Sequence, residues 1–148
     1  MTTLENILIR KIENEDSEPI SRIQKAITKA SVTTDFKQIV KEQTLRSGDA
    51  SLVAEYQGTV VGFMITYILP GGFGIEKSAW IAMFGVDPKF MGQGIGKKLA
   101  EEIFTFYKAK DITNIYTSVR WDSTDLLSFF KTLGFDRSNF INLRRILE

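Results

Sequence analysis

The feature that most constrains the fold is a strand-like run joined to a helix-like run through a turn rich in glycine. Residues 79–86 (AWIAMFGV) are apolar almost without interruption, which is typical of a central strand covered on both faces. Residues 95–106 repeat apolar side chains at three-and-four spacing, which predicts a long helix with one buried stripe. Three glycines, Gly92, Gly94 and Gly96, stand at the junction. The sequence therefore predicts a strand, a tight turn and a helix in immediate succession.

The rest of the chain predicts one α/β domain over residues 1–148, without a linker, repeat or low-complexity segment. Further strands are expected at residues 7–12, 51–56, 59–69 and 112–119, with a hairpin turn at Gln57-Gly58 and a final strand within residues 139–147. Further helices are expected from about Pro19, from the capping residue Asp35 to about Arg46, and over residues 123–134 with a C-cap at Gly134. The resulting order is βααβββαβαβ.

Composition excludes several kinds of chemistry. The 148 residues include no histidine and no cysteine, so thiol nucleophiles, imidazole bases and Cys or His metal sites are ruled out, and no metal is expected. A net charge of +1, from 19 basic and 18 acidic side chains, indicates no nucleic acid partner and no membrane partner. The opening residues 1–11 lack the pattern of a signal peptide, and no apolar run is long enough to span a bilayer. A cytoplasmic location is therefore expected.

The glycine turn favours a phosphate ligand. Glycines let the backbone approach a ligand closely, and the first free N–H groups of the following helix point at whatever binds there. Lys97 and Lys98 carry the wrong sign for the helix dipole unless an anion shares the site. A tight turn without a ligand is the alternative. The spacing fits neither a Walker A loop nor a dinucleotide fingerprint, because Met91 stands five residues before Gly96 and Lys97 takes the place of the third glycine.

The same segment resembles the acyl-CoA-binding motif of the GNAT superfamily of N-acyltransferases. Residues 86–88 (VDP) are similar to the family's V-x-P, and residues 91–96 (MGQGIG) to its [QR]-x-x-G-x-[GA] pattern. Residues 133–135 (LGF) resemble the family's second common motif, and residues 53–62 resemble its earlier strands. The likeness covers nearly the whole chain. It implies an α/β (α+β) fold with a mixed, mostly antiparallel central sheet of about six to seven strands and about four helices.

The resemblance implies that acetyl-CoA is the co-substrate and indicates its contacts. The amides of residues 91–97 would bind the pyrophosphate, the backbone of residues 84 and 86 would bind the pantetheine arm, and the helix from residue 123 would form the opposite wall. An amide near Phe84 or Gly85 would polarise the thioester carbonyl. The implied cofactor-binding residues are Phe84, Val86, Met91, Gly92, Gln93, Gly94, Ile95, Gly96, Lys97, Ser123, Phe129 and Phe130.

Four positions depart from the family pattern, and one of them is Ser123, which replaces an Asn often found after the preceding strand. Met91 replaces the leading Gln or Arg, and Phe130 stands where a Tyr commonly protonates the leaving thiolate. Trp80 stands where some relatives carry a Glu, and Glu76, four residues upstream, is the nearest carboxylate that could replace it. The candidate catalytic residues are therefore Glu76, as a base, and Gly85, through the backbone at its position. A solvated loop carboxylate is the alternative for Glu76.

Three further side chains could take part in proton transfer. Glu55 lies on a predicted strand, where a solvated or paired carboxylate is the preferred interpretation. Tyr67 and Tyr116 could relay protons through their hydroxyls, although strand tyrosines more often pack and form local hydrogen bonds.

The expected function is transfer of an acetyl or short acyl group from acetyl-CoA to a primary amine of a small molecule or peptide. Because the chain has no cysteine, we expect direct attack in a ternary complex. A noncatalytic acyl-CoA-binding sensor or interaction module is the alternative. Acceptor specificity is expected from the first two helices, their connection at residues 31–35 and the loop at residues 70–78. The resemblance also allows a homodimer, formed through the C-terminal strand.

Overall fold

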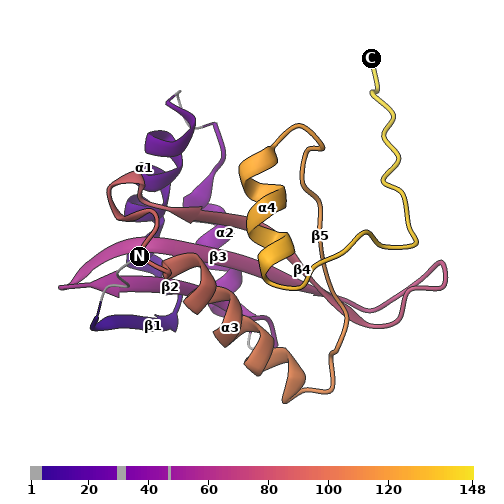
Figure 1. The fold of residues 1–148 in the computed structure, drawn as a ribbon, viewed down its shortest axis with the longest axis horizontal. Coiled ribbons are helices and arrows are strands. Elements are labelled where there is room, and N and C mark those ends of the chain that lie inside the picture. Colours follow the sequence, from indigo (N-terminus) through magenta and orange to yellow (C-terminus); the bar gives the residue numbers. More distant parts are fainter. Residues whose placement is uncertain (1–4, 30–32, 47) are drawn as a thin grey trace. The chain divides into compact units, whose positions relative to one another are not determined.

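A computed structural model describes residues 5–29, 33–46 and 48–148, in two compact units that divide the chain after Tyr116. The first unit holds the sheet and three helices, and the second holds one helix and an irregular C-terminal segment (Figure 1). The strands are β1 (Ile7–Lys11), β2 (Ser51–Tyr56), β3 (Thr59–Leu69), β4 (Ser78–Val86) and β5 (Ile115–Thr117), which ends at the division. The helices are α1 (Ser17–Thr28), α2 (Phe36–Leu45), α3 (Ile95–Lys108) and α4 (Thr124–Thr132), with short 3-10 helices η1 (Asn14–Asp16) and η2 (Pro88–Phe90). Each unit is described by itself, so the expectation of a single domain stays a prediction.

The sheet has the strand order β1-β2-β3-β4-β5, and its first three pairings are antiparallel. β2 and β3 form the predicted hairpin. Its turn residues, Gln57 and Gly58, have φ angles of 51° and 78°, as in the two-residue turns that suit the twist of paired strands. β5 follows β4 through the crossover helix α3, which is the connection that a parallel neighbour requires. The predicted mixed sheet with four helices is confirmed.

Two predictions about the strands are wrong. Within the described residues the sheet has five strands rather than six to seven, and residues 139–147 form no strand, so the element order is βααβββαβα. β5 also covers only three residues of the expected 112–119. Side chains with β propensity suit a pleated surface, but a strand forms only where a neighbouring strand supplies its hydrogen bonds. The amino-acid pattern shows the β propensity of residues 139–147, but it does not show whether a neighbouring strand is available.

The helix boundaries follow local signals that the sequence contains. The carboxylate of Asp35 accepts a hydrogen bond from Gln38 N at 3.1 Å and caps α2 as predicted. After α4, Gly134 adopts φ 91°, and Phe135 N donates to Phe130 O at 3.1 Å, which closes the helix at the predicted C-cap. No helix in the described parts of the chain is both long and apolar enough to cross a bilayer.

Helices α1 and α2 pack on one face of the sheet. Their buried side chains, including Ile20, Ile23 and Val40, form a cluster with Phe63 and Ile65 of β3. Successive side chains of a strand point to opposite faces, so Gly62, Met64 and Thr66 of β3 face the other side. That opposite face is covered by α3.

Tyr107 fixes the C-terminal part of α3 to the sheet. Its ring is fully buried, and its hydroxyl accepts a hydrogen bond from Ala50 N at 2.9 Å. The same hydroxyl contacts Thr66 Oγ1, which in turn donates to Ala50 O. Burial raises the pKa of Tyr107, so its hydroxyl keeps the proton that it can donate to Thr66. Buried polar groups are costly unless they are hydrogen-bonded, so this network holds α3 at one position along β3.

Candidate functional site

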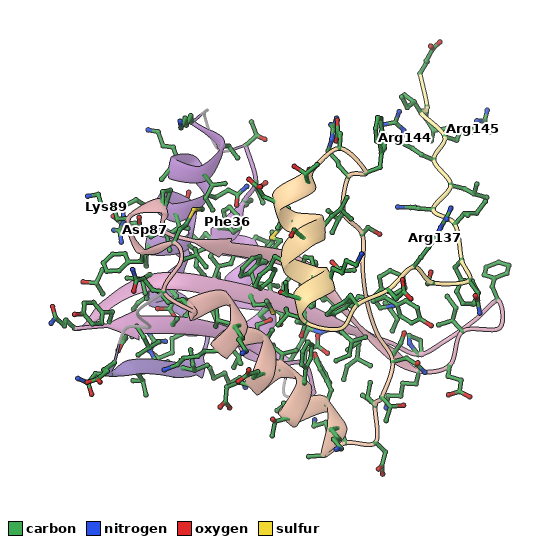
Figure 2. All side chains as sticks on the ribbon, viewed as in Figure 1. Phe36, Asp87, Lys89, Arg137, Arg144 and Arg145 are labelled. Atoms are coloured by element: carbon green, nitrogen blue, oxygen red, sulfur yellow. The ribbon has the colours of Figure 1, made fainter. Side chains whose placement is uncertain are left out.

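The glycine turn begins where β4 ends. Asp87 N donates to Val61 O at 2.8 Å, and the Asp87 carboxylate accepts from Lys89 N at 3.0 Å, which starts η2 (Figure 2). Gly92 and Gly94 then adopt φ angles of 78° and 79°, in the left-handed region where other side chains are strained. The chain therefore turns tightly from η2 into α3, as the sequence predicted.

The first turn of α3 is the best anion site among the four described helices. The hydrogen bond from Lys98 N to Gly94 O, 3.1 Å long, starts the helical ladder, so the amides of residues 95–97 precede it. No side chain caps this end of α3, and its first turn contains no acidic residue. By contrast, α1 and α4 carry Glu18 and Asp125 in their first turns, and α2 has a carboxylate cap. The partial positive charge at the start of α3 is therefore left for a ligand.

Gly62 of β3 determines how closely this turn lies against the sheet. A Cβ atom at Gly62 would come within 2.9 Å of Ile95 Cγ2 and 3.3 Å of Leu99 Cδ1. Only the absence of a side chain lets the first turn of α3 pack directly on β3. Gly62 is also the register partner of Val86, the last residue of β4. The structure thus brings the end of β4 and the glycine turn, both predicted to bind the cofactor, into one region of the first unit.

The two edges of β4 are covered to different extents. β3 pairs along the whole of β4. On the other edge, β5 has three residues against nine in β4, and the two strands meet near the start of β4, where Ala79 N donates to Asn114 O at 3.1 Å. Three residues can accompany only about a third of such a strand. Phe84 and Val86 lie in the remaining part, toward the glycine turn, where the resemblance places the pantetheine contacts.

The structure does not bring the two candidate catalytic residues together. Gly85 is paired with Phe63, whereas Glu76 precedes the first residue of β4, Ser78, which is paired with Leu69. Six residues of strand separate Phe63 from Leu69, a span of roughly 20 Å. Gly85 and Glu76 therefore lie at opposite ends of β4. The Glu76 side chain is exposed and out of hydrogen-bonding reach of a group bound at Gly85.

Gly85 also has a packing role. A Cβ atom there would lie 2.8 Å from Phe63 Cε1 and 2.9 Å from Ile27 Cδ1. The missing side chain lets α1 lie directly against β4. This contact fixes the backbone at the position where carbonyl polarisation is expected.

Other predicted residues lie in the second unit or outside the described residues. Ser123 precedes α4, and the ring of Phe130 packs edge-to-face with Phe129 and Phe135, with centroids 5.2 and 5.1 Å apart. Because each unit is described by itself, the opposite wall of the cofactor site stays a prediction. Two residues of the expected acceptor connection, 31 and 32, lie outside the described residues.

Glu55 forms an ion pair, which agrees with the preferred interpretation of a solvated or paired carboxylate. Arg10 Nε and Nη2 each lie 2.9 Å from its Oε1 atom, and the same guanidinium also binds Asp16 at 2.8 and 2.9 Å. The hydrogen bonds that Arg10 donates to Asp16, and then to Glu55, raise the pKa of Arg10. Over the ranges that the structure describes, three or more potential metal-ligating residues nowhere come together.

A contact between Trp80 and Tyr116 could not be found from the sequence. Their rings stack with centroids 4.8 Å apart and planes 23° apart. The sequence singled out each residue separately, one at a substituted base position and one as a proton relay. Their contact depends on the register between β4 and β5, and no local signal sets that register because α3 separates the two strands in the chain.

The packing at Gly62 can be tested by adding one methyl group. We expect Gly62→Ala to lower the free energy of unfolding by about 1–3 kcal/mol, because the new Cβ overlaps Ile95 and Leu99. Urea unfolding followed by circular dichroism measures the change. Gly48→Ala is the matched control, since its Cβ would lie 3.9 Å from Ile68 Cδ1, an ordinary van der Waals contact. Equal stability of the two variants would contradict the packing role.

The chain matches known proteins along most of its length. Residues 11–135 match the model of the acetyltransferase (GNAT) family. The mycothiol acetyltransferase of Amycolatopsis mediterranei (strain U-32) is 32% identical over 92 residues, which are 60% of this chain and 31% of that protein. The chain spans about a third of the length of the curated relatives that it matches.

Solved structures share the fold at low sequence identity. The aminoglycoside N-acetyltransferase AAC(6')-Iy in complex with CoA has a TM-score of 0.82 at 17% identity, over 95% of each chain. The aminoglycoside acetyltransferase meta-AAC0020 from an uncultured soil metagenomic sample, in complex with sisomicin, has a TM-score of 0.78 at 20% identity, over 96% of this chain and 97% of that one. Together with a family model that spans most of the chain, these likenesses lead to one conclusion: the protein belongs to the GNAT acetyltransferase family.

Proposed function

We propose that this protein transfers an acetyl or short acyl group from acetyl-CoA to a primary amine. The observation that carries the proposal is the first turn of α3, which is entered through two left-handed glycines and has neither a cap nor an acidic residue. A helix terminus of this kind binds a phosphate through backbone amides. In this family, that phosphate would be the pyrophosphate of coenzyme A.

We propose three sets of contacts with coenzyme A. The amides of residues 91–97 would hold the pyrophosphate, and Lys97 would add a positive charge beside it. The backbone of Phe84 and Val86 would hydrogen-bond the pantetheine arm along β4. Ser123, Phe129 and Phe130 would form the opposite wall of the site. Bound acetyl-CoA would supply an acyl group activated as a thioester.

The chain's own contribution would be positioning and backbone polarisation. An amide at Phe84 or Gly85 would donate to the thioester carbonyl as the acceptor nitrogen attacks it. The C–S bond would then break, and the CoA thiolate would leave and take a proton from solvent. Holding both reactants in one complex removes most of the entropic cost of their encounter. Direct attack is supported by the composition, because the chain has no cysteine to carry an acyl group.

The acceptor amine must give up a proton during the transfer. An ordinary alkylamine has a pKa near 10.4 and must lose a proton before it attacks. Glu76 was the expected base, yet it lies at the far end of β4 from Gly85. We therefore propose for Glu76 a contact with a remote part of the acceptor, with the proton leaving through solvent.

A primary amine of a small molecule or peptide is supported as the acceptor by the names of similar proteins. Two structures with the same fold are described as aminoglycoside acetyltransferases, and one of these is in complex with sisomicin. The curated relatives include a mycothiol acetyltransferase.

A noncatalytic acyl-CoA-binding module is the second candidate. Trp80 stands at the usual position of a base, and Phe130 at the usual position of an acid, and neither side chain can exchange a proton near neutral pH. Such a module would bind coenzyme A at the same turn and release none of it from acetyl-CoA.

We also propose a homodimer that forms through the C-terminal segment. Ile141 and Leu143 are each 83% exposed, Leu147 is 80% exposed, and the segment takes no secondary structure. A second copy could supply the neighbouring strand that this segment lacks. Analytical ultracentrifugation should show a dimer that Leu143→Lys converts to a monomer. A monomeric parent protein would overturn the proposal.

Ligand-dependent thermal stability tests the donor site. At a hundred times its dissociation constant, a ligand adds about 2.7 kcal/mol of stability. For a chain of this size, we expect acetyl-CoA and CoA to raise the melting temperature by roughly 5–10 °C, while ATP and NAD leave it nearly unchanged. No shift with either CoA compound would overturn the proposed function in both of its forms.

Two matched lysine variants sharpen this measurement. Lys97 lies in the first turn of α3, where it opposes the dipole and forms an exposed pair with Glu101 at 3.9 Å. Lys97→Gln should leave the free protein as stable or slightly more stable, while it reduces the shift with CoA. Lys108→Gln, in the last turn, should slightly destabilise the free protein and keep the full CoA shift. Equal loss of the shift in both variants would contradict binding at the first turn.

Release of free CoA separates the enzyme from the binding module. We expect a thiol reagent to detect CoA only when an amine is added with acetyl-CoA. Initial rates at several concentrations of both substrates should give intersecting lines in a double-reciprocal plot. Parallel lines would indicate a covalent acyl-enzyme and contradict direct attack. Binding of acetyl-CoA without release, across a panel of amines, would favour the noncatalytic module.

A further inference from the structure

Three aromatic side chains lie side by side across three strands of the first unit. Tyr67 of β3 is the register partner of Trp80 on β4, and directly paired residues of antiparallel strands project from the same face. The indole of Trp80 in turn stacks on the ring of Tyr116 in β5, with centroids 4.8 Å apart. We call Tyr67, Trp80 and Tyr116 the aromatic row.

The aromatic row lies where the packed core on the α1 and α2 face gives way to solvent. Tyr67 packs against the core cluster of that face. Ile65, two residues earlier on β3, is fully buried, whereas all three members of the row are half-buried and Leu69 is 46% exposed. The row is therefore a partly accessible surface at the edge of the core.

Contacts within the protein hold the row in place and determine what it can offer a ligand. Trp80 Nε1 donates to Ser78 Oγ at 3.1 Å, so the single donor of the indole is already used. The Arg46 guanidinium lies 5.6 Å from the centre of the Tyr67 ring, and its charge is matched by an ion pair with Asp49. Trp80 thus offers a ligand its ring surface rather than a hydrogen-bond donor, and the Arg46 charge near Tyr67 is matched by Asp49.

The direction of the proposed donor arm leads toward this row. The glycine turn follows the C-terminal end of β4, so an arm that starts at the turn and pairs with Val86 and then Phe84 runs toward lower residue numbers. The acyl group would then point toward the start of β4, where Trp80 lies. At this end of the strand, Ala79 N donates a hydrogen bond to the carbonyl of Asn114, the residue before β5. An acceptor that rests on the row would approach the acyl group from that end.

We infer that the aromatic row is part of the acceptor site and selects primary amines that carry an aromatic ring. This inference rests on the proposed acetyl transfer. Pairs of aromatic rings in offset or edge-to-face contact gain about 0.5–1.5 kcal/mol beyond their burial, which corresponds to about a 2- to 10-fold preference over a saturated ring of similar size. The nitrogen itself would be acetylated, so the row acts on specificity and not on the bond that forms.

Fluorescence of Trp80 provides a direct binding test. The chain has two tryptophans, and Trp121 is 86% exposed, so Trp121→Phe leaves Trp80 as the only indole. This variant is titrated with 2-phenylethylamine and with 2-cyclohexylethylamine, whose amines are alike and whose rings differ in flatness. We expect the first to change the emission of Trp80 and to bind about 2- to 10-fold more tightly. Equal affinity, or no change in emission with either amine, would overturn the inference.

Matched variants show whether the preference comes from the row. Tyr116→Leu in the Trp121→Phe background should remove the preference for the flat ring. Phe106→Leu in the same background should keep it, because Phe106 is a half-buried aromatic of α3, the helix on the opposite face of the sheet from the row. Trp80→Leu, measured as the ratio of kcat/KM for the two amines, should approach a ratio of one. The same ratio in all variants would overturn the inference.

The two levels of proposal fail in different ways. If acetyl-CoA and CoA give no thermal shift, the proposed function fails, and the amine titration still reports on the row. If the thermal shift is present and the two amines behave alike, the donor site stands and the aromatic row is not part of the acceptor site.

Discussion

The attachment of α3 to the sheet is the constraint on which the candidate site depends. At its start, Ile95 and Leu99 pack over Gly62, and at its end the buried hydroxyl of Tyr107 is bonded to the backbone before β2. These two contacts fix the position and direction of a 14-residue helix. Because the helix begins at the glycine turn, they also place the amides of that turn beside the end of β4. A phosphate site built from backbone amides needs this placement more than it needs any particular side chain.

The absence of histidine and cysteine and the presence of the aromatic row both bear on how an amine would be acetylated. Without histidine or cysteine, catalysis by this chain would rest on positioning and on backbone amides that polarise a carbonyl. An acceptor amine must still lose a proton, and in the proposed scheme that proton leaves through solvent. Trp80 stands where some relatives carry a Glu, and it would contact the ring of the acceptor instead of accepting the proton of its amine.

Local signals in the sequence were reliable, and signals that depend on distant partners were not. The hairpin at Gln57-Gly58, the cap at Asp35 and the left-handed glycines before α3 all formed as predicted, because each is decided within a few residues. The final strand did not form, since its partner is not part of the local sequence. Glu76 was chosen by its distance along the chain, yet extended β4 carries it away from Gly85.

The sequence by itself determined the order of the elements as far as α4, the glycine turn and the absence of thiol and imidazole chemistry. These follow from residue type and periodicity, which act over one or two turns of chain. Only the tertiary structure decided which residues meet across strands: Gly62 beneath α3, Ile27 against Gly85, and Trp80 on Tyr116. Such contacts depend on strand register and helix packing. Strand register and helix packing are both determined by the free energy of the whole fold, so no single segment of the sequence specifies them.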